Sequence, residues 1–570
     1  MRAETKEERG WELDALASAI SSFFERRVKG EEGKALARLA GELAAKAGTG
    51  ASHLESRQAE EIFENWASLP AVGSEDETLP LVRTGDGKLY FRRFYEYEKQ
   101  VAEALGKRLA RPPVPAAQGT IDFFKSSLEA QVDDQQALAV GVAVQKDLLL
   151  LTGGPGTGKT RTIVTMLAAH LEANPGVRIA LAAPTGKAAF RMRESVLETM
   201  GSLDLPDSIR SALLDSARST TLHRLLGSKI GSVDFRRNKG NPLPHDLVVV
   251  DEASMVDLPL MAKLCDALRD EAKMILVGDA DQLAPVQGGA VFNGLVKPSK
   301  RNVFSPTDLP MMTAFSNSGT KSEGEDPLAG SLVCLSRVHR REGSPSAAVL
   351  GELCDAIRDG RTDDALASAK AGGESIRFVE KLDDPSIDPS IQAGFERLAQ
   401  AQSPADALLA LRDFRILCAH NHGRYGVANW NLRADGLLPS DELRPRPVVV
   451  GVNDYTVGLF NGDDGVVLGN RCHFGAEDGT REVARSRLPN HQLGYASTIH
   501  RSQGSEFEEV MIVLPPADAR LLTRELLYVA VSRAKRGIIL LGDEVALETA
   551  IERSEESRSG VLDMLDHSSL

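Results

Sequence analysis

A glycine-rich segment at residues 153–160 has the residue types and the spacing of a phosphate-binding loop. Glycine lets successive backbone N–H groups face a phosphate, because no Cβ intervenes. Lys159 is long enough to reach the β- and γ-phosphates, and the Thr160 hydroxyl is a ligand for Mg²⁺. The segment therefore predicts an ATP or GTP site rather than a structural turn. Its residues are Gly153, Gly154, Pro155, Gly156, Thr157, Gly158, Lys159 and Thr160.

An acidic pair, Asp251 and Glu252, directly follows the apolar run 247–250. One carboxylate at a strand end can hold Mg²⁺ through water, and its neighbour can polarise the attacking water as a general base. We assign the first role to Asp251 and the second to Glu252. Such a pair also occurs at helix-capping turns, but together with a phosphate-binding loop it favours catalysis.

Two amides and two arginines can complete this site. Gln282 follows the apolar run 274–277 and is expected to contact the γ-phosphate, whereas Gln135 offers paired hydrogen bonds to an adenine edge. Arg340 and Arg533, in the second half of the chain, can neutralise charge on the transferred phosphoryl group. By residue chemistry alone, Gln135 also fits a solvated helix start and Arg340 a surface ion pair.

Hydroxyl-bearing and cationic residues gather in two further segments, 183–189 and 219–224. Hydroxyls, exposed N–H groups and cations of this kind suit phosphate contacts along a nucleic-acid strand. Capped helix starts have the same composition, and a lone histidine is commonly a packed residue. The candidates are Thr185, Lys187, Thr221 and His223.

The elements that must position these residues alternate between helix and strand from Ile121 onward, which predicts an α/β fold with mostly parallel sheets. Continuous apolar runs indicate strands that are buried on both faces. A second set of such runs predicts a second α/β half, with the nucleotide between the halves. Short runs and Asn-Gly-type turns at 447–468 predict a small antiparallel insert, expected to be a barrel. The runs are 148–151, 179–183, 247–250 and 274–277, then 415–419, 510–514 and 538–541.

Length and charge limit the possibilities further. A chain of 570 residues predicts about three or four domains, and we expect residues 297–330 to form a mobile loop. The net charge of −14 means that nucleic acid must be held by a local groove, because the field of the whole molecule repels it. The five cysteines are scattered, which disfavours a zinc or iron–sulfur site and suits a reducing cytoplasm. We expect no signal peptide and no membrane-spanning helix.

The ordered motifs together resemble the RecD family of superfamily 1 helicases. The resemblance extends over roughly residues 85 to 543. It is based on the order of the motifs, their spacing and their residue sequences taken together. It implies two RecA-like P-loop NTPase domains, an SH3-like β-barrel insert along the DNA path and a mainly helical N-terminal domain. The motifs are residues 183–189, 221–227, 251–257, 278–283, 453–463, 498–507 and 523–534.

The resemblance also implies roles for individual residues. Gln135 is expected at adenine, Gln282 and Arg340 at the γ-phosphate, and Arg533 as an arginine finger. Gly504 and Glu506 are expected at the nucleotide, with ATP and Mg²⁺ as the cofactors. The residues expected to contact DNA are Thr185, Lys187, Thr221, His223, Asn461, Thr498 and His500.

The expected domains are an N-terminal partner-docking domain at 1–115, a first motor domain at 116–325 and a second at 326–570. The insert is expected at about 437–492. The N-terminal module is similar to that of the family branch that serves in exodeoxyribonuclease V, the RecBCD complex. This similarity implies RecB-like and RecC-like partners in a heterotrimer, single-stranded DNA at duplex ends as the track, and a cytoplasmic location.

The expected function is an ATP-dependent 5′ to 3′ DNA helicase subunit that acts on double-strand break ends in recombinational repair. Its direction of movement is implied by the resemblance alone. A stand-alone helicase of the same family is an alternative, and so is a non-catalytic scaffold that binds ATP as a structural switch. The residue chemistry is equally compatible with movement on RNA, since backbone tracking serves either polymer.

Overall fold

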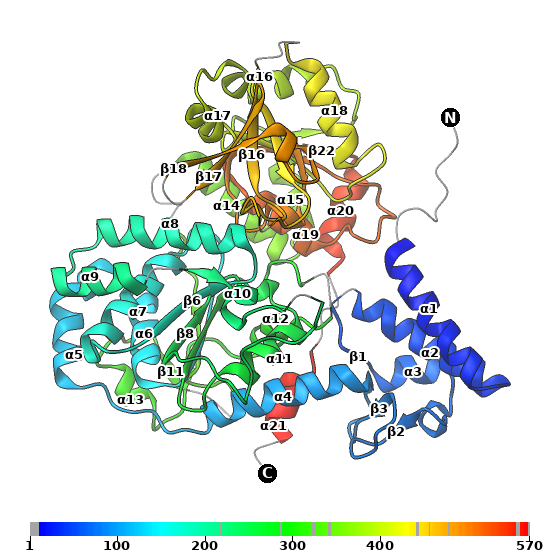
Figure 1. Cartoon of the computed structure of the whole chain (residues 1–570), viewed down its shortest axis with the longest axis vertical. Coiled ribbons are helices and arrows are strands. Elements are labelled where there is room, and N and C mark those ends of the chain that lie inside the picture. Colours follow the sequence, from blue (N-terminus) through cyan, green and yellow to red (C-terminus); the bar gives the residue numbers. More distant parts are fainter. Residues whose placement is uncertain are drawn as a thin grey trace.

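The computed structural model describes residues 11–48, 50–216, 219–229, 231–285, 288–321, 326–339, 344–439, 444–454, 456–476, 479–554 and 559–567. Two parallel sheets, each covered by helices, lie one above the other in Figure 1, and a smaller N-terminal unit lies to one side. None of the described helices is long and apolar enough to cross a membrane.

The N-terminal unit combines helices with a small four-stranded sheet in the order β1-β4-β3-β2. Its core contains Leu36, Leu39 and Leu43 of the second helix together with Trp66 and Leu81. The long helix α4 leaves this unit and packs on the first parallel sheet, because its apolar face shares a core with Leu148 and Leu150. The elements are α1 (Trp11–Arg27), α2 (Glu31–Ala47), β1 (His53–Leu54), α3 (Ser56–Ile62), β2 (Val72–Gly73), β3 (Leu81–Arg83), β4 (Leu89–Phe91) and α4 (Arg92–Leu109).

The first parallel sheet has the strand order β12-β5-β9-β8-β6-β7, and each pair of neighbouring strands is parallel. Alternate residues of β5 point to opposite faces, so Leu149 and Leu151 pack under α6 and α7, whereas Leu148 and Leu150 pack under α4 and α11. We call this sheet with its helices the first lobe. Its strands are β5 (Leu148–Gly153), β6 (Ile179–Ala183), β7 (Thr220–Thr221), β8 (Leu247–Val250), β9 (Lys273–Gly278) and β12 (Leu332–Leu335). Its helices are α5 (Gln118–Phe123), α6 (Asp134–Gln145), α7 (Lys159–Ala173), α8 (Gly186–Ser202), α9 (Asp207–Ser216), α10 (Leu222–Leu226), α11 (Leu258–Ala267) and α12 (Val291–Val296).

The second parallel sheet has the order β13-β22-β21-β14-β20, and its neighbouring strands are also parallel. Helices α14, α15, α19 and α20 share the core of one face, and α16, α17 and α18 share that of the other. We call this sheet with its helices the second lobe. Its strands are β13 (Ile376–Val379), β14 (Phe414–Cys418), β20 (Ala496–Thr498), β21 (Phe507–Val513) and β22 (Ala534–Leu541). Its helices are α14 (Pro345–Arg358), α15 (Thr362–Ala371), α16 (Ile387–Gln400), α17 (Pro404–Ala410), α18 (Val427–Leu437), α19 (Arg524–Ser532) and α20 (Glu544–Glu552).

A five-stranded sheet is inserted between β14 and β20, in the order β18-β17-β16-β15-β19. All of its neighbouring strands are antiparallel, as the Asn-Gly-type turns predict. Its small core includes Val448, Leu459, Cys472 and Phe474. The strands are β15 (Arg446–Val450), β16 (Asp464–Leu468), β17 (Arg471–Ala476), β18 (Gly479–Ala484) and β19 (His491–Leu493).

Residues 297–330, which the composition predicts as a mobile loop, contain short regular elements. The prediction is wrong for the described part of this segment, because Phe304, Met312 and Phe315 are buried in the core of the first lobe. These apolar side chains anchor a segment whose other residues are mostly polar. The elements are β10 (Val303–Phe304), α13 (Leu309–Met312) and β11 (Thr320–Lys321), and residues 322–325 lie outside the described residues.

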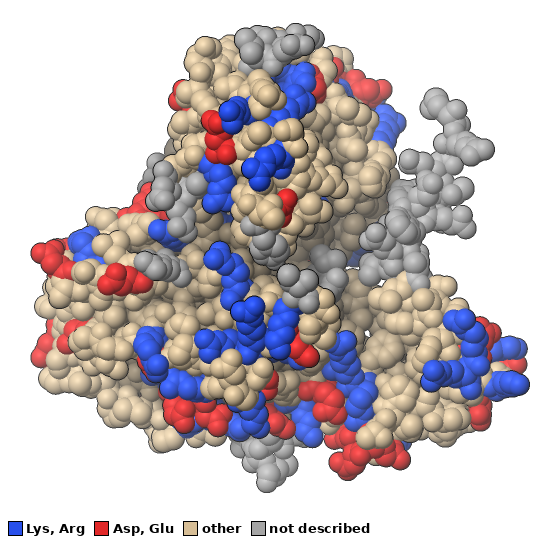
Figure 2. Space-filling model, viewed as in Figure 1, with Lys and Arg blue, Asp and Glu red and all other residues tan. Residues whose placement is uncertain are grey.

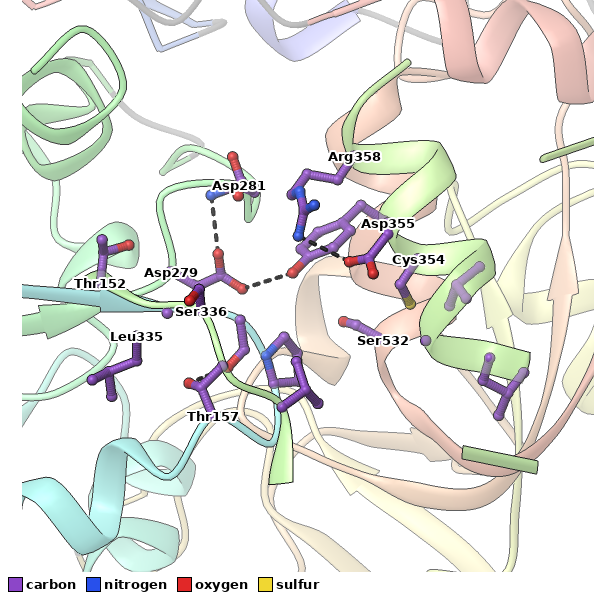
Figure 3. Close-up of a pocket in the computed structure, with 18 of the residues that line it drawn as sticks. Thr152, Thr157, Asp279, Asp281, Leu335, Ser336, Cys354, Asp355, Arg358 and Ser532 are labelled. Atoms are coloured by element: carbon purple, nitrogen blue, oxygen red, sulfur yellow. Dashed lines mark hydrogen bonds and ion pairs between the residues drawn. The ribbon is translucent and has the colours of Figure 1, made fainter. Parts of the chain in front are cut away.

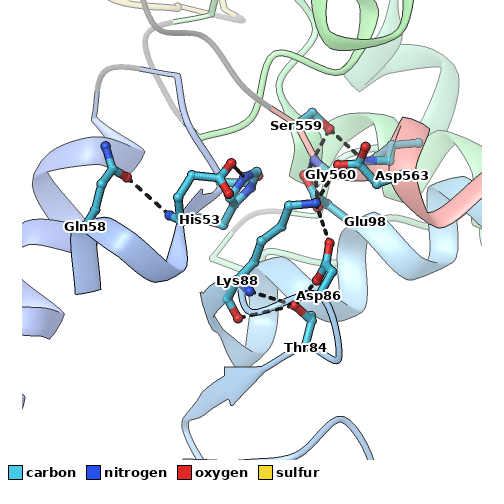
Figure 4. Close-up of polar contacts among 12 residues, drawn as sticks. His53, Gln58, Thr84, Asp86, Lys88, Glu98, Ser559, Gly560 and Asp563 are labelled. Carbon is cyan, nitrogen blue, oxygen red and sulfur yellow. Dashed lines mark hydrogen bonds and ion pairs between the residues drawn. The ribbon is translucent and has the colours of Figure 1, made fainter. Parts of the chain in front are cut away.

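The last helix, α21 (Val561–His567), packs against α4 and α12, far from the second lobe that precedes it in the chain. Glu98 on α4 is fully buried and accepts hydrogen bonds from Ser559 Oγ and Gly560 N, each at 2.9 Å. Lys88 Nζ lies 2.6 Å from Asp86 and 2.5 Å from Asp563 (Figure 4). The end of the described chain is therefore fixed to the N-terminal unit and to the first lobe.

Candidate nucleotide cleft and nucleic-acid interface

The glycine-rich loop after β5 forms a concave backbone surface, or cradle. Any residue larger than glycine at its glycine positions would place a side chain inside this surface. Gly156 and Gly158 have φ values of +79° and +83°, in the region that favours glycine. A Cβ on Gly158 would lie 2.3 Å from Gln136 Nε2. Lys159 Nζ donates to the carbonyl oxygens of Gly153 at 2.6 Å and Gly154 at 3.2 Å. The ammonium group thus already lies against the loop, where a phosphate would contact the same backbone.

The acidic pair lies at the carboxyl end of β8, beside this loop. Asp251 Oδ1 accepts a hydrogen bond from Glu252 N at 2.9 Å. Glu252 has φ of 51°, and in the described part of the chain only Asn302 is another non-glycine residue with positive φ. Backbone strain of this kind is concentrated at functional sites. Burial raises the pKa of both carboxyls; for Glu252 the charge of Asp251 adds to this effect, while Lys159 opposes it.

Gln282 follows β9 and is buried, with 3% of its surface exposed. Its Nε2 lies 3.4 Å from Asp279 Oδ2, and Asp279 Oδ1 accepts a hydrogen bond from Asp281 N at 3.0 Å. Within the described residues, Gln282 Oε1 has no hydrogen-bond partner. A buried acceptor without a partner is costly, so this oxygen suits a donor such as a water molecule.

A cavity of about 450 Å³ separates the two lobes next to the glycine-rich loop. Figure 3 shows first-lobe residues on one side and second-lobe residues on the other. The first lobe contributes Gly153, Gly154, Pro155, Thr157, Asp279 and Ser336, and the second lobe contributes Asp355, Arg358, Tyr528, Ser532 and Lys535.

Of the two arginines predicted at the nucleotide, Arg340 and Arg533, the structure describes only Arg533. Arg340 lies outside the described residues. Arg533 directly follows α19 with 4% of its surface exposed, and it donates to the carbonyl oxygens of Val529 and Ser505, each at 3.2 Å. Its positive charge partly offsets the rise in the pKa of Glu252 that burial and Asp251 cause, so it acts on this carboxylate from the other lobe.

The two neighbouring glutamines at the start of α6 have separate contacts. Gln135 Nε2 donates to Ser336 Oγ at 2.9 Å, and its Oε1 accepts from Ser336 N at 2.7 Å, at the edge of the cavity. Gln136 is 1% exposed, and its Nε2 donates to Thr157 O at 3.2 Å. Sequence reasoning did not select Gln136. The pattern that could have identified Gln136 is the spacing Asp133-x-x-Gln136, which is a capping box at the start of α6. This box turns the Gln136 side chain back toward the start of the helix.

Gly504 and Glu506, expected at the nucleotide, lie between β20 and β21. Gly504 has φ of +70°, and a Cβ there would lie 3.8 Å from Ala188 on α8. Glu506 Oε2 lies 3.8 Å from Lys535 Nζ. This turn therefore faces the first lobe.

Three of the hydroxyls expected to contact DNA make local contacts with the backbone. Thr185 caps α8, Thr221 caps α10, and Thr498 accepts a hydrogen bond from Arg501 N at 3.3 Å. His223 and Asn461 are exposed. Burial lowers the pKa of His500 to about 4, so this ring is neutral at pH 7.

Lys187 joins the first lobe to the inserted sheet through an ion pair. Its Nζ lies 2.5 Å from Asp464 Oδ2 on β16, and Arg415 Nη1 lies 3.3 Å from Asp464 Oδ1. These two cations hold the pKa of Asp464 at about 2, although burial alone would raise it. A phosphate contact by Lys187 requires the ammonium group to leave Asp464.

A glycine cradle, an acidic pair and two parallel sheets that share one cleft define a two-lobed, RecA-like P-loop NTPase. The AAA domain family matches residues 136–288, and the UvrD-like helicase C-terminal domain family matches residues 493–541. The chain belongs to the RecD family: it is 40% identical to the RecBCD enzyme subunit RecD of Mycobacterium tuberculosis H37Rv, over 84% of this chain and 80% of that protein.

Other relatives are similar over comparable lengths. The RecBCD enzyme subunit RecD of Haemophilus influenzae is 32% identical over 84% of this chain and 80% of its own length. The ATP-dependent RecD2 DNA helicase of Deinococcus radiodurans is 30% identical over 89% of this chain and 62% of its own length. Among solved structures, Bacteroides Pif1 bound to single-stranded DNA is 18% identical over 72% of this chain and 92% of that chain, with a TM-score of 0.39.

Proposed function

We propose that this chain is an ATP-dependent DNA helicase that serves as a subunit of a RecBCD-type helicase–nuclease. The proposal includes 5′ to 3′ movement along single-stranded DNA from duplex ends, in the cytoplasm. One observation carries it: residues of the nucleotide cradle in the first lobe and Tyr528 of the second lobe line one cavity, and the charge of Arg533 in the second lobe acts on Glu252 in the first. A scaffold that only binds ATP does not need such a charge beside Glu252.

The residues fit a triphosphate and a divalent cation. The cradle leaves no room for side chains at Gly158, and Lys159 is already directed at the backbone that would hold the phosphates. The Thr160 hydroxyl and the Asp251 carboxylate are the proposed ligands of Mg²⁺. When bound, this ion neutralises phosphate charge.

The proposed hydrolysis divides its tasks between the lobes. Glu252 accepts a proton from the attacking water, and the unpaired Gln282 Oε1 orients that water. Arg533, held by two backbone carbonyls, supplies positive charge opposite the developing phosphate charge. Arg340 remains proposed at the γ-phosphate, Gln135 at adenine, and Gly504 and Glu506 at the nucleotide.

DNA is proposed to follow the seam where α8 meets the inserted sheet. A Cβ added to Gly186, at the start of α8, would lie 3.8 Å from the Cβ of Phe460 in the inserted segment. Helix α8 and the inserted segment are therefore in contact. Lysines and arginines gather on the face shown in Figure 2, although the net charge is −14. This local charge supports backbone binding by an acidic protein. The proposed contacts are Thr185, Lys187, Thr221, His223, Asn461, Thr498 and His500.

The remaining architecture is proposed from the family. We assign the inserted antiparallel sheet an SH3-like barrel fold at about residues 437–492, within a second motor domain at 326–570 that follows a first motor domain at 116–325. The N-terminal domain, 1–115, is proposed to dock on a RecC-like subunit, next to a RecB-like one. The identities of 40% and 32% to the RecD subunits of Mycobacterium tuberculosis and Haemophilus influenzae, against 30% to the RecD2 helicase, support this choice over a stand-alone enzyme.

Strand displacement on substrates with a 5′ or a 3′ single-stranded tail tests the motor and its direction together. Wild type is expected to unwind the 5′-tailed substrate and to hydrolyse ATP faster when single-stranded DNA is added. Lys159→Gln should abolish both activities and leave the thermal midpoint unchanged, since the lysine donates its hydrogen bonds to loop carbonyl oxygens that a glutamine amide can also reach. Unwinding by the Lys159→Gln variant would contradict the proposal, and preference for the 3′ tail would reverse its direction.

Co-expression with RecB-like and RecC-like chains, followed by gel filtration, tests the subunit assignment. One peak that contains all three chains is expected. Elution of this chain alone, with full unwinding activity, would support the stand-alone helicase instead.

A further inference from the structure

A tyrosine of the second lobe reaches into the first lobe at the nucleotide cleft. Tyr528 lies on α19 with 3% of its surface exposed, and its hydroxyl donates to Asp279 Oδ2 at 3.3 Å. The two residues are 249 positions apart. Asp279 directly follows β9, so this hydrogen bond joins the lobes.

The oxygen that accepts this bond is shared with Gln282. Gln282 Nε2 lies 3.4 Å from the same Asp279 Oδ2, and the second carboxylate oxygen is held by Asp281 N. The same oxygen of Asp279 therefore lies within hydrogen-bond distance of both the Gln282 amide and the Tyr528 hydroxyl. The other end of the Gln282 amide, Oε1, has no partner among the described residues and remains available.

The Tyr528 hydroxyl also lies beside the phosphate-binding loop. A Cβ added to Gly154 would be 3.1 Å from this oxygen, so any larger residue there would crowd the tyrosine. Burial raises the pKa of Tyr528 well above its usual range, and the group stays a hydrogen-bond donor at neutral pH. One hydroxyl thus contacts the carboxylate that orients Gln282 and lies close to the loop that would hold phosphate.

We propose that Tyr528 is a positioning residue: its hydrogen bond to Asp279 places the Gln282 amide when the two lobes approach each other. The proposal rests on the proposed function, in which Gln282 acts at the γ-phosphate. Separation of the lobes removes the bond and releases Asp279 and Gln282. Hydrolysis therefore becomes fast only in the closed arrangement.

Tyr528→Phe removes the hydroxyl and keeps the ring. We expect kcat for DNA-stimulated ATP hydrolysis to fall about tenfold while KM for ATP stays within about twofold, because the lost bond is to the charged Asp279, which is not among the residues proposed to hold ATP. Tyr495→Phe is the matched control: Tyr495 is fully buried in the second lobe, and its hydroxyl donates to Asp435 at 3.1 Å. This control should keep the wild-type kcat.

A double-mutant cycle separates positioning from a purely structural role. In a Gln282→Ala background, Tyr528→Phe should cause no further loss of kcat, because both changes remove the same placement. Asp279→Asn changes the acceptor of the same hydrogen bond. Its effect on kcat should therefore not add to the effect of Tyr528→Phe when the two variants are combined. Additive losses, or a Tyr528→Phe kcat equal to that of Tyr495→Phe, would overturn the proposal. Absence of DNA-stimulated hydrolysis in wild type would instead reject the proposed function itself.

Discussion

Arg533 combines a structural task with an electrostatic one. Its guanidinium donates to Val529 O, Ser505 O and Ser532 Oγ, which fixes the turn before β21 to the end of α19. A guanidinium has five N–H donors, so these bonds leave donors for a phosphate. The charge is thus held by contacts with the backbone, on a residue between Ser532 and Ala534, which both line the cavity, instead of being carried by a flexible side chain.

Replacement of Arg533 by lysine is expected to lower kcat for DNA-stimulated ATP hydrolysis by about 10³-fold. Lysine keeps the charge but cannot reproduce the forked bonds to two carbonyl oxygens. Steady-state kinetics and the thermal midpoint should be measured together, because those bonds also stabilise the fold. Arg536→Lys, at an exposed position on β22, is the control and should change neither quantity. A kcat for Arg533→Lys within threefold of wild type would refute the assigned role.

At this scale the sequence predicts residues whose partners are close in the chain. The glycine-rich loop and the Asp251–Glu252 pair are recognisable because their chemistry depends on local spacing. Gln136, Tyr528 and the pairing of Lys187 are not, because each depends on which distant backbone or carboxylate the fold places opposite. Lys187 and Asp464 are 277 positions apart, and no pattern in either segment connects them.

The elements α8 and β16 are joined by that same ion pair, which links the first lobe to the inserted sheet. Lys187 and Asp464 have 18% and 21% of their side chains exposed, and Arg415 only 3%. Charges this well covered depend on their partner, because water screens them little. The ionic link between the two elements therefore depends on a single carboxylate.

Asp464→Asn should destabilise the protein by about 3 kcal/mol, because it leaves two covered cations without a counter-charge. Thermal unfolding followed as a function of pH is the measurement. The pKa of Asp464 is lowered to about 2, so its contribution is present above about pH 4 and is lost as the pH falls through 2. The difference between variant and wild type should close over that interval. Asp413→Asn, which removes a more exposed pair with Arg397, should have little effect at any pH.

The sequence predicts the two parallel sheets and the antiparallel insert because each has its own hydrophobic pattern. It does not predict the small N-terminal sheet, since strands of two or three residues carry no measurable alternation. It is also wrong about residues 297–330, where a few buried aromatic and methionine side chains fix a mostly polar segment.

At the scale of the whole molecule, the N-terminal unit, the first lobe and the last helix form one packed body. Val561 and Leu565 of α21 share a core with Val101 and Leu105 of α4. A Cβ on Gly560 would lie 2.1 Å from the Tyr90 hydroxyl, so only glycine permits this approach. The second lobe is thus connected to the first by covalent chain at both of its ends.

Glu98→Gln should loosen α21, because an amide offers a donor where two carboxylate oxygens accept from Gly560 N and Ser559 Oγ. Amide hydrogen exchange of residues 561–567 is expected to become at least about tenfold faster, while exchange in β5 is unchanged. Glu103→Gln, at an exposed position on the same helix, should leave exchange as in wild type. Equal protection of α21 in both variants would show that the apolar contacts alone hold it.

The return of α21 to α4 also sets an order for biogenesis. Lys88 and Asp563 are 475 residues apart, so at about 5–20 residues per second a ribosome needs roughly 25–95 s to synthesise the second partner after the first. During that time the Glu98 carboxylate and the part of α4 that α21 covers lack their final partner on the nascent chain. Chaperones that shield apolar helices, or an early-bound assembly partner, would therefore have their greatest effect on this protein before translation ends.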